Sequence, residues 1–122
     1  MSNAVAHELV QKSLVGEALE HGPMAIFVAD HDGRYVALNA YACDVLGYTR
    51  DELLELRVTD VAVNDDAAAD YGEMQRHGAR AHTGLTILRR KDGTELPMNF
   101  RASQTRVGGI ELYVGVCWPV AD

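Results

Sequence analysis

Residues 25–54 constrain the fold more than any other part of the sequence. Two short apolar runs, at 25–29 and 35–38, flank a polar segment that contains Asp32 and Gly33. An Asp-Gly pair between such runs predicts a tight hairpin, because glycine adopts positive φ angles without steric strain. This stretch therefore begins with two antiparallel strands.

Two helices are predicted directly after this hairpin. Asn39 stands where an N-cap belongs, and its side chain can accept a hydrogen bond from a free backbone N–H. Apolar residues follow at helical spacing as far as Leu46, and Gly47 can end the helix in the left-handed region. Residues 49–52 (Thr-Arg-Asp-Glu) form a capping box that begins the second helix.

The remainder of the chain supplies further helices and three strands. A helix is predicted over 65–77, after an irregular stretch with one short helical turn. Residues 95–102 alternate between polar and apolar, which is typical of a half-buried strand. The last strand, 110–118, is apolar on both faces, so both of its faces should be covered.

The same residues resemble the PAS family of sensory domains. In that family a hairpin is followed by an Asn that begins a helix. The helix ends in Leu-Gly-Tyr, and a Thr-x-x-Glu-Leu box follows. Here these are Asn39, residues 46–48 and residues 49–53. A second block, 89–98, is similar to the later PAS hairpin, and the resemblance covers residues 22–118.

This resemblance implies an α+β fold. The expected sheet has five antiparallel strands in the order 2-1-5-4-3, with helices on one face. The PAS domain should occupy residues 22–120. Residues 1–21 should form an N-terminal amphipathic helix, because an apolar stripe runs through positions 5–20.

The resemblance also implies a function. We expect a sensory domain in signal transduction that binds a small molecule or a protein partner and relays through dimerisation. One alternative is a ligand-free dimerisation or adaptor module, and another is a small enzyme that uses the same cavity. No nucleophile elbow, phosphate loop or catalytic carboxylate pair is present in the sequence, so no enzyme is expected here.

The motif by which many PAS domains relay to an output helix is absent from this sequence. Many PAS domains end in Asp-Ile-Thr, whereas this chain has Pro-Val-Ala at 119–121. Both the Asp and the Thr are therefore missing. The chain could be a fragment of a larger sensor kinase or cyclase, with its output partner elsewhere.

A pocket between the helices and the sheet is the implied ligand site. Its candidate lining residues come from the predicted helices and strands. For each apolar candidate, ordinary core packing is the competing interpretation. The candidates are Phe27, Asn39, Tyr41, Cys43, Tyr71, Met74, Ile87, Met98 and Trp118.

Three cofactor types are disfavoured by comparison with the family. Covalent FMN needs a cysteine in Asn-Cys-Arg-Phe, and residues 58–66 contain none. The coumaroyl chromophore is attached to a cysteine just after Asp-Val-Ala-Pro, where this chain has Asp-Val-Ala-Val and then Asn64. Haem-binding relatives use a histidine in the long helix, whose middle here is Ala67–Ala69. Noncovalent binding of a flavin remains an alternative, because it needs none of these residues.

The composition of the chain disfavours some classes of binding partner and predicts a cellular location. The net charge is −7, with acids and bases interspersed, which disfavours nucleic acid and anionic membranes. No apolar run is long enough for a membrane span and no signal peptide heads the chain, so a cytoplasmic location is expected.

No metal site is expected either. The two cysteines, Cys43 and Cys117, lie far apart in the sequence and form no Cys-x-x-Cys motif. Asp30, His31 and Asp32 are interpreted as a solvated turn, because Asp favours turns for local backbone hydrogen bonding.

A homodimer is predicted from a burial argument. If helices cover one sheet face only, the apolar side chains on the other face need a partner. We assign Tyr113 and Cys117 to that outer face, beside Trp118. The N-terminal helix at 5–20 is weakened by Gly16 and also needs a packing partner. The predicted dimer is built from residues 5–20 and the outer face of the sheet.

Overall fold

The computed structural model describes residues 16–63 and 82–120. Residues 16–21 are helical. The elements that follow are, in chain order, β1 (Ala25–Ala29), β2 (Tyr35–Leu38), α2 (Ala40–Leu46), α3 (Arg50–Leu54), α4 (Val58–Val61), β3 (His82–Arg89), β4 (Glu95–Val107) and β5 (Ile110–Pro119).

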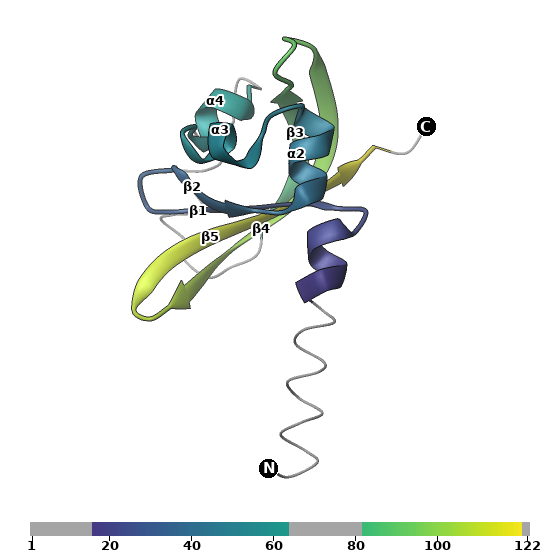
Figure 1. Cartoon of the computed structure of the whole chain (residues 1–122). Coiled ribbons are helices and arrows are strands. Elements are labelled where there is room, and N and C mark those ends of the chain that lie inside the picture. Colours follow the sequence, from purple (N-terminus) through teal and green to yellow (C-terminus); the bar gives the residue numbers. More distant parts are fainter. Residues whose placement is uncertain (1–15, 64–81, 121–122) are drawn as a thin grey trace.

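The strands form one five-stranded sheet in the order β2-β1-β5-β4-β3. Every neighbouring pair is antiparallel. Figure 1 shows α2, α3 and α4 together on one side of this sheet. The α+β architecture and the strand order predicted from the sequence are therefore confirmed.

The helix signals in the sequence are also confirmed in atomic detail. The Asn39 side chain accepts from the N–H of Ala42 and caps α2, and Gly47 ends this helix at φ 80°. Thr49 and Glu52 form a reciprocal capping box at the start of α3. These local contacts satisfy backbone groups that helix ends would otherwise leave without partners.

The β1–β2 hairpin closes through the turn predicted around Gly33. The Asp30 carboxylate accepts hydrogen bonds from the N–H groups of Asp32 and Arg34, at 2.9 and 3.0 Å. Gly33 adopts φ 83°, which a residue with a side chain rarely tolerates. The observed role of Asp30 is thus the local backbone bonding expected of a turn residue.

Two predicted helices extend beyond what the structure describes. Of the N-terminal helix expected within residues 1–21, the helical turn at 16–21 is seen, and positions 1–15 lie outside the described residues. The helix predicted over 65–77 also lies outside them. Both remain predictions.

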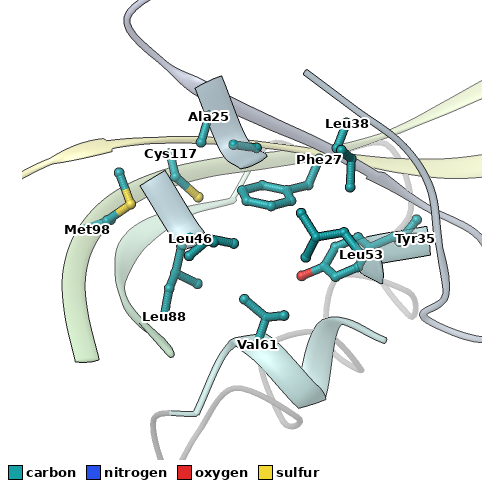
Figure 2. Close-up of a cluster of buried hydrophobic side chains, with 12 residues drawn as sticks. Ala25, Phe27, Tyr35, Leu38, Leu46, Leu53, Val61, Leu88, Met98 and Cys117 are labelled. Atoms are coloured by element: carbon teal, nitrogen blue, oxygen red, sulfur yellow. The ribbon is translucent and has the colours of Figure 1, made fainter. Parts of the chain in front are cut away.

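The core lies between the helices and the inner face of the sheet. Leu46, Leu53 and Val61, one from each helix, have no exposed surface, and neither does Met98 of β4. Figure 2 shows the three helix side chains pointing toward Phe27 and Leu88 on the sheet. Burial of this kind contributes about 1.5–3 kcal/mol for each large apolar side chain.

The assignment of Tyr113 and Cys117 to the outer face of the sheet was wrong. Both side chains are buried on the inner face, and Figure 2 shows the Cys117 sulfur within the core. Their β1 partners, Ala29 and Ala25, are buried as well. Alternation correctly separated the two faces of β5. It could not decide which face meets the helices, because both are apolar.

Candidate functional site

The predicted ligand site is the space between α2–α4 and the inner face of the sheet. Phe27 and Met98, two of its candidate residues, lie there and belong to the buried core. The Phe27 ring contacts the ring of Tyr35, with centroids 5.4 Å apart. In the described part of the chain these two candidates pack against other side chains as core residues do.

Asn39 is buried and its carboxamide is fully occupied. The amide nitrogen donates to the carbonyls of Leu19 and Met24, at 2.6 and 2.8 Å. The amide oxygen accepts from the N–H groups of Ile26 and Ala42, at 3.0 and 3.1 Å. Two donors and two acceptor positions are all that an Asn side chain offers. Its role in the described structure is to join β1 and α2 to the segment before β1.

Tyr41 and Cys43 lie on α2, both partly buried against the core. Burial raises the pKa of the Cys43 thiol, the charge of Arg50 opposes this, and Asp44 and Glu20 add to it. Burial also raises the pKa of Cys117, to about 12. Both groups are therefore protonated thiols at neutral pH, and neither has the thiolate character of a reactive cysteine.

The structure places two further candidates on the opposite face of the sheet. Ile87 lies between the buried residues Thr86 and Leu88 along β3, and Trp118 follows buried Cys117 along β5. Since successive strand residues point to opposite faces, both side chains lie on the outer face. The structure thus does not bring all the candidates together. Tyr71 and Met74 lie outside the described residues.

A row of apolar side chains runs along the outer face at the centre of the sheet. In the register of β1 and β5, Ile26 pairs with Val116 and Val28 pairs with Val114. Trp118 extends the row toward the end of β5. We call these five residues the outer apolar patch. An apolar outer face was predicted from the sequence, but Tyr113 and Cys117 were assigned to it in place of Val114 and Val116.

Contacts from the β3–β4 turn to the helices were not foreseen. The Arg90 side chain donates to the carbonyl of Val45 at 3.2 Å, and the Lys91 N–H donates to the carbonyl of Leu46 at 2.9 Å. These bonds satisfy two of the last carbonyls of α2. The partners lie about 45 positions apart in the sequence, and no local motif links them.

Glu52 is held by two kinds of contact. Its carboxylate pairs with the Lys91 ammonium at 2.7 Å and accepts from the Thr49 N–H at 2.9 Å. The hydrogen bond from Lys91, followed by that from the Thr49 backbone, lowers the pKa of Glu52 from 4.5 to about 2. A carboxylate stabilised only in the folded state makes stability depend on pH.

The free energy of unfolding of a Glu52→Gln variant should therefore depend less on pH in the acid range than that of the wild type. The folded pKa lies below the unfolded one, so this contribution is fully present above pH 4.5 and is lost as the pH falls through about 2. The wild type should be more stable than the variant at pH 7, and the two should converge near pH 2. Urea unfolding at a series of pH values measures the difference. A Glu55→Gln control, at an exposed position, should follow the wild type, and a constant gap from pH 7 to 2 would contradict the assignment.

Within the described part of the chain, neither a metal site nor a membrane-spanning helix is found. Among residues 16–63 and 82–120, no group of three or more His, Cys, Asp and Glu side chains could hold a metal ion. No helix in these ranges is long and apolar enough to cross a membrane.

Comparison with known sequences shows the family. The sequence model of the PAS domain matches residues 23–117, which is most of the chain. This chain therefore belongs to the PAS domain family. No curated protein matches it.

Solved structures agree on the fold. The PAS domain of an HTR-like protein from Haloarcula marismortui superposes with a TM-score of 0.80 at 20% identity, covering 98% of this chain and all of that one. A domain of a sensory box histidine kinase/response regulator from Geobacter sulfurreducens gives 0.74 at 24% identity, covering 88% and 93%. The PAS domain of nitrogen regulation protein NR(II) from Vibrio parahaemolyticus gives 0.74 at 14%, covering 88% and 98%. Several neighbours are thus domains of signalling proteins.

Proposed function

We propose that this chain is a PAS sensory domain in signal transduction that relays through a homodimer formed on the outer apolar patch. The family match and the sensor histidine kinase domains among the structural neighbours support a signalling role. The observation that carries the dimer is the patch itself, an apolar row at the centre of a sheet whose helices α2–α4 lie on the other face (Figure 1).

A second copy of the chain is the partner that fits this patch. An isologous contact needs the same surface on both subunits, and a row along the central strand β5 can pack against itself across a two-fold axis. All five patch residues are uncharged, although the chain carries a net charge of −7. Two copies can therefore meet here without opposing like charges.

Val116→Arg should dissociate this dimer. Val116 lies in the middle of the patch, opposite Ile26, and burying two symmetry-related guanidinium groups without partners is strongly unfavourable. Sedimentation equilibrium should show a weakening of at least about 100-fold. The matched control is Val36→Arg, an exposed position on the edge strand β2, which should associate as the wild type does. Unchanged association of Val116→Arg would refute the patch as the interface.

A small-molecule ligand between the helices and the sheet is the second part of the proposal. Phe27, Tyr41, Cys43 and Met98 lie on that side of the sheet or on α2. The competing proposal is a ligand-free dimerisation or adaptor module. The filled packing of Leu46, Leu53, Val61 and Met98 in the described residues favours it.

Native mass spectrometry with an absorption spectrum separates these two. We expect any bound group to leave on denaturation, because residues 58–66 offer no cysteine for a covalent flavin and the chain has no Cys-x-x-Cys-His motif. The denatured protein should be colourless and have the mass of the unmodified chain. A chromophore that stays attached in acid would contradict this expectation.

A further inference from the structure

Two contacts on neighbouring residues hold the end of the N-terminal helical turn. The carbonyl of Leu19 accepts a 2.6 Å hydrogen bond from the Asn39 amide, and the carboxylate of Glu20 forms an ion pair with Arg50. Figure 1 shows this turn, in purple, leading into β1. The contacts come from two different elements, since Asn39 is the N-cap of α2 and Arg50 is the first residue of α3.

The two contacts differ in strength. The Asn39 amide is buried and uses its other positions on Met24, Ile26 and Ala42, so it cannot turn toward water if Leu19 moves. Displacing the turn would leave a buried N–H without a partner, which is unfavourable. The Arg50–Glu20 pair is about half exposed, and exposed pairs are weak and screened by salt.

We propose that Asn39 and Arg50 form a latch that couples the segment before β1 to α2 and α3. The buried amide fixes where the helical turn ends, and the ion pair sets how much of the time the turn is docked. A shift of α2 or α3 then changes the docking of the turn, and a pull on the turn changes α2 and α3, since such coupling is reciprocal. The latch uses the backbone N–H of Ile26 but no side chain of the outer apolar patch, so it can fail or hold independently of the proposed dimer.

Hydrogen exchange measured by mass spectrometry on the intact chain tests this latch. Arg50→Gln and Glu20→Gln should each speed exchange in residues 19–24 by about two- to five-fold, the range expected for an exposed pair. The double variant should show no further increase, because both changes break the same pair. Glu20→Gln should also speed exchange in the first turn of α3. At about 1 M salt the wild type should approach the variants.

Arg106→Gln is the matched control. It removes another exposed Arg–Glu pair, with Glu111 at 2.8 Å, on the β4–β5 hairpin. It should leave residues 19–24 unchanged. Asn39→Asp, which keeps the oxygen that caps α2 but loses both N–H donors, should speed exchange in 19–24 more than Arg50→Gln while the Ala42 amide stays protected. Unchanged exchange in Arg50→Gln and Glu20→Gln, additive effects in the double variant, or an equal effect of Arg106→Gln would overturn the proposal.

Discussion

Replacing Leu46 by alanine is expected to lower the free energy of unfolding by about 2–5 kcal/mol. Leu46 ends α2 with no exposed surface, and it belongs to the same core cluster as Leu88 of the sheet (Figure 2). The substitution loses apolar burial and leaves a cavity that the neighbouring strands close only in part. Urea unfolding followed by circular dichroism measures the change, with the slope against urea expected to stay constant.

The matched control is Leu19→Ala in the helical turn before β1. Leu19 is 51% exposed, and its backbone carbonyl, which accepts from Asn39, is retained in the variant. This change should lower stability by less than about 1 kcal/mol. Equal losses for the two variants would show that Leu46 is not a core residue in solution.

Asn39→Ala should lower stability by about 2–4 kcal/mol, through the loss of an N-cap and the exposure of buried backbone groups without partners. The variant leaves the N–H groups of Ile26 and Ala42 and the carbonyls of Leu19 and Met24 without their side-chain partner. A loss of this size is unusual for a polar residue of small volume. Thermal and urea unfolding should agree on it.

Asn99→Ala provides the comparison for this variant. Asn99 lies in β4 opposite Trp118 and Leu85, on the outer face, and caps no helix. Its replacement should change stability by less than about 1 kcal/mol. If Asn39→Ala were equally mild, the junction between β1, α2 and the preceding segment would be energetically unimportant.

The parts of the fold that short-range chemistry determines were predictable from the sequence. As helix caps, Asn39, Gly47 and the Thr49–Glu52 box bond to backbone groups within four residues, so their residue types predict the helix ends. The further bonds of Asn39 to Leu19, Met24 and Ile26 are long-range and had no such signal. The Asp-Gly turn at Gly33 is equally local. The two sequence blocks that resemble the PAS family then fixed the strand order, which local signals alone leave open.

Long-range contacts were not predictable in the same way. Arg90 and Val45, Lys91 and Glu52, and Arg50 and Glu20 meet only because the fold brings them together. Exposed Arg, Lys and Glu residues are common on any surface, so nothing in the sequence marks these particular pairs.

The sheet face on which each site candidate lies could be predicted only in part, for a related reason. Strand alternation places Cys117 and Trp118 on opposite faces, but it does not say which face is inner when both are apolar. Phe27 and Met98 were correctly placed on the inner side, whereas Ile87 and Trp118 lie on the outer face. The missing information was the register of β5 with β1, in which Cys117 faces buried Ala25.

Light scattering on the intact chain, over a concentration series up to ~100 μM, tests the central claim most directly. At that concentration a dimer of micromolar affinity is almost fully formed. The proposed relay through the outer apolar patch predicts a dimer that dissociates on dilution and that Val116→Arg abolishes. A monomer throughout the series would contradict it.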